Sequence, residues 1–423
     1  MRRVWVNSWV VAAAAGLAAC AGAGTPTATP AVVVLTAAPP TLSNPIPTAY
    51  PTKVVTPTLD PFFVTPDGTP EPSLFAPVSA DEWQAGPETA AVTVIEYSDF
   101  ECGYCAAVAG LMRQLREEYP DDLRLVFRHY PLPQHEKAQL AAAAAEAAGA
   151  QGAFWAMHDM LFAEQATWIT LTVADLRPVV ITFAADLGLD AAQFEADLDD
   201  PLTAATVQTA YETARDIPLP GAPFLLWNGG LFPDEGLTNH YALSTLIRLE
   251  RLKARQFAAP PPDVIDPFKQ YTATLHTIQG DIVIELYAEL TPLTVNNFVF
   301  LARAGWYDDV TFHRVITDFA AQTGDPSGTG YGGPGYFIPD EFVPALVYNA
   351  AGWVGMANAG PDTNGSQFFI SLGPLPEYNG RYPLFGKVIA GLEVVLALTP
   401  RDPNADAEAP PGDRILSITI EEK

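Results

Sequence analysis

The spacing of apolar residues divides the folded part of the chain into two regions. Between residues 81 and 258, short apolar runs typical of buried strands are separated by segments in which apolar residues recur every three or four positions, as on one face of a helix. In order, the pattern predicts a strand at 91–97, a helix at 106–118, a strand at 123–130, helices through 136–214, a strand at 219–229 and a helix at 241–255. This order predicts an α/β domain with a helical insertion.

Residues 269–423 show a different pattern, in which apolar and polar residues alternate over short runs. A hairpin is expected around Gly280, because the alternating runs 271–277 and 281–287 flank it. Further short strands are expected at 312–316, 353–357, 367–370 and 415–420. Many short strands with few helices predict a second, all-β domain, built as a closed barrel with flanking helices. Residues 259–268, which begin with a run of prolines, are the expected linker between the two domains.

The amino terminus lacks both patterns. Arg2 and Arg3 precede the apolar run 10–19, which is too short for an ordinary membrane span and ends in Leu-Ala-Ala before Cys20. This arrangement resembles the lipobox of bacterial lipoprotein signal peptides. The resemblance implies that residues 1–19 are cleaved as a signal peptide and that Cys20 carries lipid, at the outer face of the bacterial cytoplasmic membrane. An ordinary secretory signal is the alternative, and it also places the protein outside the cytoplasm.

Residues 20–80 are rich in Pro, Thr and Ala, and Lys53 is their only charged residue before Asp60. Such a composition does not supply enough apolar surface for a core, so we expect a disordered, extended tether between the membrane and the first domain. A wall-binding or glycosylated stalk remains an alternative for this segment.

Composition narrows the classes of function. The net charge of −27 over 423 residues argues against nucleic-acid binding, which requires a basic surface. The three cysteines are Cys20, Cys102 and Cys105, and the six histidines show no spacing typical of zinc ligands. The sequence therefore predicts no metal site and no cofactor.

Cys102 and Cys105 form a Cys-Gly-Tyr-Cys motif between a predicted strand and a predicted helix. Thiols at this spacing can close into a disulfide, and the partial positive charge of a helix N-terminus favours a thiolate on the first cysteine. The motif therefore indicates dithiol–disulfide exchange, with a fixed structural disulfide as the alternative. His129, His135 and His158 are candidates to tune the thiolate, although packed or surface positions are the better account of such residues.

Three segments carry a family resemblance in the first domain: DFECGYC at 99–105, FRHYPL at 127–132 and GAPF at 221–224. They resemble DsbA-like thiol–disulfide oxidoreductases, which have a thioredoxin-like fold. The resemblance implies that Cys102 is the exposed nucleophile, that Cys105 is the resolving thiol, and that Pro223 is a cis-proline facing them. The intervening Gly103-Tyr104 leaves the redox direction open between oxidase, isomerase and reductase.

A second resemblance covers nearly all of residues 269–423. FHRVITDF at 312–319, MANAGPDTNGSQFF at 356–369 and NGRYPLFGK at 379–387 resemble the cyclophilins, which are peptidyl-prolyl cis-trans isomerases. The resemblance implies that Arg314 donates a hydrogen bond to the prolyl nitrogen and so withdraws its lone pair from amide resonance. The substrate-binding residues that it implies are Phe319, Gln322, Ala357, Asn358, Gln367, Phe369, Tyr378 and Tyr382.

Together these features predict an exported, lipid-anchored folding catalyst with two active sites. Its expected partners are unfolded or newly exported polypeptides and a membrane protein that recycles the thiol pair, but not nucleic acid. Two alternatives remain open. One is a surface chaperone or binding lipoprotein in which one or both sites are inert, and the other is a disulfide reductase dedicated to a single partner.

Overall fold

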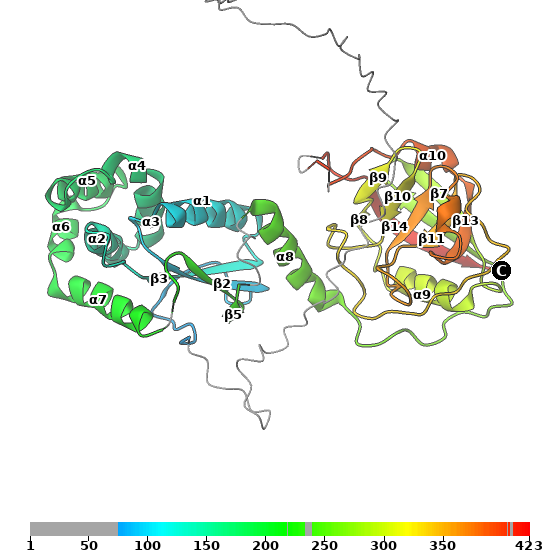
Figure 1. The fold of residues 1–423 in the computed structure, drawn as a ribbon, viewed down its shortest axis with the longest axis horizontal. Helices are drawn as coiled ribbons and strands as arrows, with labels where there is room; N and C mark the ends of the chain where they lie inside the picture. Colours follow the sequence, from blue (N-terminus) through cyan, green and yellow to red (C-terminus); the bar gives the residue numbers. More distant parts are fainter. Residues whose placement is uncertain (1–74, 218, 233–238, 404, 407–408) are drawn as a thin grey trace, which may run out of the picture. The chain divides into compact units, whose positions relative to one another are not determined.

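The computed structural model describes residues 75–217, 219–232, 239–403, 405–406 and 409–423. The predicted signal peptide, Cys20 and the tether as far as residue 74 lie outside the described residues. The described chain forms two separate β-sheets, one of five strands and one of nine (Figure 1). We call residues 75–252 the five-stranded region and residues 253–423 the nine-stranded region.

The five-stranded sheet has the order β1-β3-β2-β4-β5. Its strands are β1 (Trp83–Ala85), β2 (Val92–Ser98), β3 (Leu123–His129), β4 (Phe224–Trp227) and β5 (Gly230–Leu231). The central strands β2 and β3 are parallel, as the intervening helix requires, whereas the other pairings are antiparallel. Residues of β2 and β3 are buried on both faces, which explains their nearly continuous apolar character.

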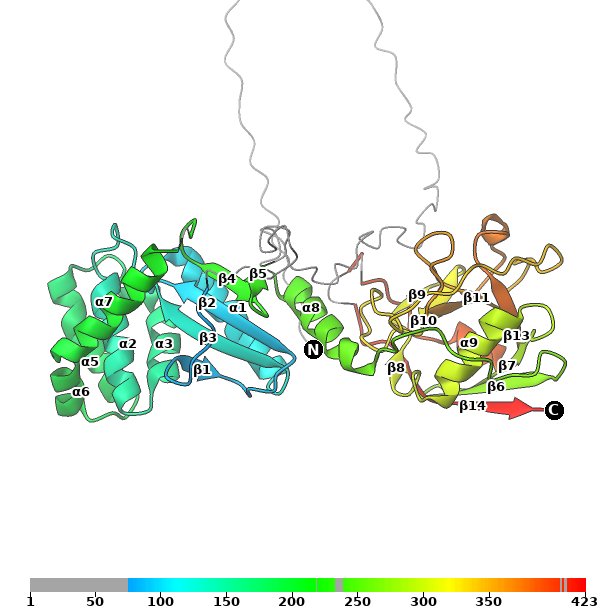
Figure 2. The same cartoon turned by 90° about the horizontal axis from the view of Figure 1, so that it is seen from below.

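Eight α-helices belong to the described part of this region. They are α1 (Gly103–Glu118), α2 (Ala138–Ala150), α3 (Phe154–Ala163), α4 (Gln165–Trp168), α5 (Val173–Asp186), α6 (Ala191–Leu198), α7 (Pro201–Arg215) and α8 (His240–Leu252). Figures 1 and 2 show that α2, α5, α6 and α7 gather beside the sheet as the predicted helical insertion. The side chains of Thr172, Asp190 and Asp200 cap α5, α6 and α7 by accepting backbone hydrogen bonds.

Helix α2 owes its central position to small side chains. Seven of its alanines are buried, so neighbouring helices can approach its backbone closely. Gly149 must also lack a side chain, because a Cβ atom there would lie 2.4 Å from the indole ring of Trp83. That indole stacks on Phe154 of α3 at a centroid distance of 4.3 Å, which ties α2 and α3 to the start of the sheet.

The nine-stranded sheet has the order β8-β14-β6-β7-β13-β11-β12-β10-β9. Its strands are β6 (Tyr271–Thr277), β7 (Gly280–Leu286), β8 (Val310–Thr311), β9 (Arg314–Ile316), β10 (Ala320–Thr323), β11 (Trp353–Met356), β12 (Phe368–Ser371), β13 (Leu384–Ala390) and β14 (Arg414–Glu422). The edge strands β8 and β9 are joined by Phe312 and His313, and the described residues form no ladder between them. Strand pairing therefore does not confirm the predicted closed barrel.

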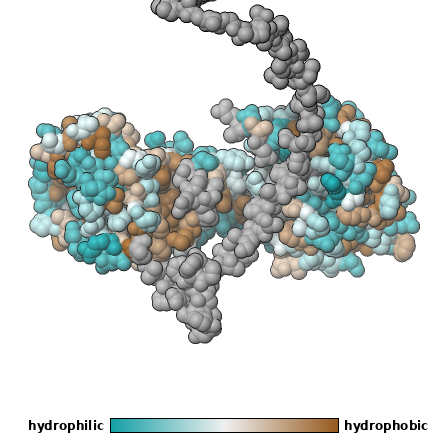
Figure 3. All heavy atoms as spheres, in the orientation of Figure 1, coloured by the Kyte–Doolittle hydropathy of each residue, from teal (hydrophilic) through white to brown (hydrophobic). Residues whose placement is uncertain are grey.

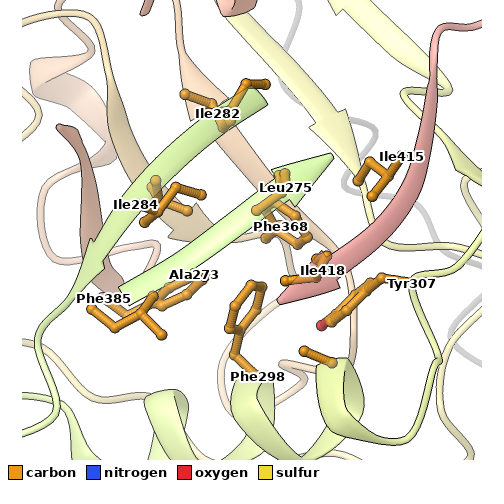
Figure 4. Packing of buried hydrophobic residues seen from close by; sticks show 14 of the residues in the cluster. Ala273, Leu275, Ile282, Ile284, Phe298, Tyr307, Phe368, Phe385, Ile415 and Ile418 are labelled. Carbon is orange, nitrogen blue, oxygen red and sulfur yellow. The ribbon is translucent and has the colours of Figure 1, made fainter. Parts of the chain in front are cut away.

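The core of the nine-stranded region lies between this sheet and helix α9 (Pro292–Arg303). In Figure 4, Leu275 and Ile284 from the β6–β7 hairpin face Phe298 of α9 and Phe368 of β12. The predicted hairpin at Gly280 is present, with Thr277 paired to Gly280. The remaining helical segments are η2 (Lys253–Arg255), η3 (Pro376–Tyr378) and α10 (Leu392–Leu396).

Residues 257–264 pack on the rest of the nine-stranded region. The Phe257 amide donates to the Pro334 carbonyl at 2.8 Å, and the Val264 amide donates to the Asn296 side chain at 2.7 Å. Asn296 in turn donates to the Pro262 carbonyl at 3.0 Å. Part of the predicted linker is thus hydrogen-bonded to α9.

The surface mixes polar and apolar residues. In Figure 3, hydrophilic residues cover much of the visible face of both regions, with smaller hydrophobic patches between them. Among the described residues, no helix has the length and apolar character needed to cross a membrane.

Candidate functional sites

The two thiols lie at the start of α1, as the sequence predicts. Cys102 is the N-cap residue of the helix, and its Sγ accepts a hydrogen bond from the Cys105 amide at 3.4 Å. The Cys102 thiol also donates to the Ala222 carbonyl at 3.4 Å. Both cysteines are free. Cys105 is fully buried and Cys102 is only 7% exposed, so the prediction of an exposed nucleophile is wrong. Tyr104, between them, is 82% exposed.

The two thiols differ strongly in acidity. The hydrogen bond from the Cys105 thiol is the largest influence on Cys102 and, with the backbone amides of Tyr104 and Cys105, lowers the pKa of Cys102 from 9.0 to about 6. The same hydrogen bond and burial raise the pKa of Cys105 well above its ordinary value. Cys102 is therefore the thiol that ionises near neutral pH, while Cys105 keeps its proton.

Pro223 follows the residue that contacts Cys102. The Ala222–Pro223 peptide bond is cis, and the Ala222 carbonyl is the group that Cys102 contacts. The structure therefore brings together the three residues that the sequence singled out, Cys102, Cys105 and Pro223.

A set of polar contacts holds the loop before Cys102. The Asp99 carboxylate is buried and accepts hydrogen bonds from the amides of Glu101 and Leu132 and from His135 Nδ1, each at 2.7 Å. Glu101 forms a salt bridge of 2.6 Å with Lys137. Of the three candidate histidines, His135 contacts this loop, whereas His129 pairs with Glu146 and His158 with Asp159.

Gln165 of α4 connects the helical insertion to the thiol site. Its side-chain Nε2 donates to the carbonyls of Phe100 at 2.7 Å and Cys102 at 3.1 Å. The sequence gives no signal for this contact, because 63 residues separate Gln165 from Cys102.

Glu96 is a buried acid that sequence analysis missed. It lies on β2 and is completely buried, and neither carboxylate oxygen has a hydrogen-bond partner of normal geometry among the described residues. Burial raises its pKa from 4.5 to about 7, and the Ser98 hydroxyl opposes this only weakly. Ser98 also lowers the pKa of Cys105. The sequence signal was an acidic residue inside an otherwise apolar strand.

Replacing Glu96 by glutamine is expected to flatten the pH dependence of stability in the five-stranded region. Because the pKa of Glu96 is raised on folding, the parent has its full stability below about pH 4.5 and loses about 3 kcal/mol as the pH rises through 7. Calorimetry of the full chain at pH 5 and pH 8 measures this. Glu88→Gln, at an exposed position, is the control and should behave as the parent. Equal pH dependence in Glu96→Gln and the parent would contradict the burial of a titrating Glu96.

Arg314 begins β9 and is almost completely buried. Its guanidinium lies over the Phe319 ring, with Cζ 5.8 Å from the centroid. Nε and Nη2 donate to the two carboxylate oxygens of Asp402 at 3.3 and 3.5 Å. Gln322 is directly opposite Arg314 in the β9–β10 ladder, so both side chains project on the same face of the sheet.

Four aromatic side chains gather next to Arg314. Tyr378 meets Phe319 and Phe369 edge-on, at centroid distances of 5.7 and 5.8 Å. Tyr382 lies 4.5 Å from Tyr378 and also meets Phe369 edge-on. These contacts form one apolar cluster, with ring faces suited to pack against a pyrrolidine ring.

Amide groups line the same face. Gln322 donates to the Gln367 side chain at 2.9 Å, and its own buried Oε1 has no hydrogen-bond partner among the described residues. The Ala357 amide donates to the Gln367 carbonyl at 2.9 Å, and the Asn358 side chain donates to Asn364 at 3.0 Å. The structure thus links Arg314, Phe319, Gln322, Ala357, Gln367, Phe369, Tyr378 and Tyr382 through contacts, places Asn358 next to Ala357, and adds Asp402.

Gly355 lets the aromatic cluster approach the sheet. A Cβ atom at this position would lie 1.8 Å from the Tyr348 hydroxyl and 3.0 Å from the Phe369 ring. Tyr348 stacks against Phe369 at 5.5 Å, so the glycine makes room for the residue that supports the pocket wall.

Comparison with known proteins supports the division into a five-stranded and a nine-stranded region. Residues 272–420 match the family model described as cyclophilin type peptidyl-prolyl cis-trans isomerase, and residues 79–246 match a thioredoxin model. The five-stranded region is thus a thioredoxin-like domain, and the nine-stranded region is a cyclophilin-type isomerase domain.

Individual relatives match the second region. Peptidyl-prolyl cis-trans isomerase CYP18-2 of Arabidopsis thaliana is 47% identical over 128 residues, which cover 30% of this chain and 78% of that protein. Peptidyl-prolyl cis-trans isomerase-like 1 of Homo sapiens is 48% identical over 141 residues, or 33% of this chain and 83% of that protein. A solved cyclophilin type isomerase of Cryptosporidium parvum has 37% identity, covers 37% of this chain and 99% of its own, and has a TM-score of 0.34. The chain belongs to the family of cyclophilin-type peptidyl-prolyl cis-trans isomerases.

Proposed function

We propose that this protein is an exported folding catalyst in which a DsbA-like thiol–disulfide site and a proline-isomerase site act from one lipid-anchored chain. The thiol part is supported chiefly by the unequal acidity of Cys102 and Cys105 beside Ala222. The isomerase part is supported by family membership and by Arg314 next to an aromatic pocket.

The thiol site supports exchange in two balanced steps. The Cys102 thiolate attacks a client disulfide, forms a mixed disulfide and releases one client sulfur as a thiolate. Cys105 then loses its proton and attacks Cys102, which closes the Cys102–Cys105 disulfide and releases the second client thiolate. Two electrons pass from the protein to the client, and the reverse sequence oxidises a client.

At the second site, we assign to Arg314 the role of hydrogen-bond donor to the nitrogen of a proline held in the aromatic pocket. The X-Pro barrier of about 18–20 kcal/mol comes from amide resonance. A hydrogen bond to the nitrogen weakens that resonance most in the twisted transition state, where the lone pair is localised, so it acts by differential binding. The Oε1 of Gln322, which has no hydrogen-bond partner within the described part of the chain, is an acceptor for a substrate amide beside it.

The two activities fit one role, because disulfide rearrangement and proline isomerisation are both slow steps in the folding of exported chains. The test is to measure both in one preparation of the full mature chain, with glutathione for exchange and an X-Pro peptide for isomerisation. Absence of exchange would leave a cyclophilin with an inert thioredoxin-like domain, which is the binding-lipoprotein alternative.

Cys20→Ser is expected to release the protein from the membrane fraction, because lipid attachment requires the cysteine thiol. Cell fractionation followed by immunoblotting measures this, and Cys102→Ser is the matched cysteine control that should remain with the membrane. Membrane association that survives in Cys20→Ser would contradict the proposed anchor.

A further inference from the structure

Among the described residues, the acidic partner of the Arg314 guanidinium comes from a distant loop. Nε and Nη2 donate hydrogen bonds to the two carboxylate oxygens of Asp402. The Arg314 side chain is 6% exposed and that of Asp402 18%, so the pair lies at the boundary between the pocket and solvent. Asp402 is 88 residues from Arg314 in the sequence, and it lies in none of the segments that carry the cyclophilin resemblance.

The backbone places Asp402 opposite Arg314. Arg401 and Val315 exchange two hydrogen bonds, of 2.8 and 2.9 Å, as an isolated antiparallel bridge. In an antiparallel bridge, the residue after one member of the pair lies opposite the residue before the other member. Asp402, which follows Arg401, therefore lies opposite Arg314, which precedes Val315. The contact between the two side chains is therefore a result of register.

The loop that carries Asp402 is fixed at its base. The Asp413 carboxylate accepts the Thr399 amide at 2.6 Å, and the Asp413 carbonyl accepts the Phe312 amide at 2.8 Å. Within the loop, the Asp402 carbonyl accepts the amides of Ala405 and Asp406, each at 3.0 Å. These bonds hold the Asp402 backbone in a turn beside β9.

From this geometry we infer that Asp402 is a positioning residue for proline isomerisation, acting through Arg314. An arginine side chain has many rotamers, and a carboxylate that binds the Nε–Nη2 edge fixes the plane of the guanidinium. The Nη1 group is then left as the donor for the prolyl nitrogen. This inference rests on the proposed role of Arg314.

The Asp402 carboxylate also neutralises part of the Arg314 guanidinium charge, which would weaken the hydrogen bond to the prolyl nitrogen and lower the rate. If this neutralisation were dominant, removal of Asp402 would raise the rate. The near-complete burial of Arg314 favours positioning, since the donor must be aimed before the substrate arrives.

The test is to compare Asp402→Ala, Asp402→Asn and Asp402→Glu with the parent in the full chain. NMR exchange spectroscopy with an Ala-Pro-containing peptide gives the isomerisation rate of bound peptide and the dissociation constant separately. We expect Asp402→Ala to lower the rate about tenfold and to change the dissociation constant by less than about twofold. Asp402→Asn should show a smaller loss, and Asp402→Glu should restore part of the rate.

Two controls make the outcome specific. Asp309→Asn removes an exposed partner of Arg414, at 3.3 Å in the same domain, and should leave both quantities unchanged. Arg314→Ala separates the inference from the function on which it rests. Full activity in Arg314→Ala would refute both. Loss in Arg314→Ala with a parental or higher rate in Asp402→Ala, or with an effect on the dissociation constant alone, would refute only the role of Asp402.

Discussion

Arg314→Ala is expected to lower kcat/KM for isomerisation of an X-Pro peptide by about 10²- to 10³-fold, which corresponds to about 3–4 kcal/mol of transition-state stabilisation. The reason is that the variant keeps the aromatic pocket of Phe319, Phe369, Tyr378 and Tyr382 but lacks the donor aimed at the prolyl nitrogen. The effect should therefore appear in kcat more than in KM. A protease-coupled assay with a proline tetrapeptide, run over a range of peptide concentrations, measures both constants.

Arg314→Lys tests whether charge alone is sufficient. Lysine keeps the positive charge but lacks the planar fork that contacts Asp402, so we expect it to recover little of the lost activity. Arg414→Ala removes an exposed arginine of the same domain and should have no effect. An unchanged rate in Arg314→Ala would remove the enzymatic role assigned to this side chain.

Cys102→Ser is expected to abolish thiol–disulfide exchange. The remaining Cys105 is fully buried, and its pKa is raised, so it cannot replace the nucleophile. Reduction of insulin and equilibration with glutathione measure the loss. The expected effect is complete within the sensitivity of either assay, whereas proline isomerisation by the same preparation should be unchanged.

Cys105→Ser provides the complementary result. Without the resolving thiol, the mixed disulfide between Cys102 and a client is not released by the second step, so it should accumulate as a covalent adduct on non-reducing gels. Exchange activity that persisted in Cys102→Ser, or an adduct formed through Cys105, would reverse the assignment of the two thiols.

The sequence predicted the order of elements well where one periodicity dominates. The strands at 91–97 and 123–130 and the helix at 106–118 correspond to β2, β3 and α1. The helical insertion could be predicted only as a block, because the alanine-rich α2 is buried on most sides and shows no amphipathic face. The alternation of apolar and polar residues also could not show whether the nine-stranded sheet closes, since closure depends on pairing between the edge strands β8 and β9.

The sites were predictable where motifs are local. Cys102 and Cys105 lie three residues apart, and the structure places both at the start of α1 as expected. Glu96 was missed although an acidic residue inside a largely apolar strand was a signal, because the motif search concentrated on the nearby cysteines. Gln165 and Asp402 reach their sites through tertiary contacts across 63 and 88 residues, which no local pattern encodes.

The bond between the Cys102 thiol and the Ala222 carbonyl has a consequence for how clients engage. In the neutral protein the sulfur supplies the proton of that bond. Once Cys102 ionises, the proton is gone, and the Ala222 oxygen becomes an open acceptor next to the new thiolate. We expect a peptide N–H of an arriving client to donate to this oxygen. Ionisation of Cys102 would then both make the sulfur a nucleophile and free a backbone acceptor for the client.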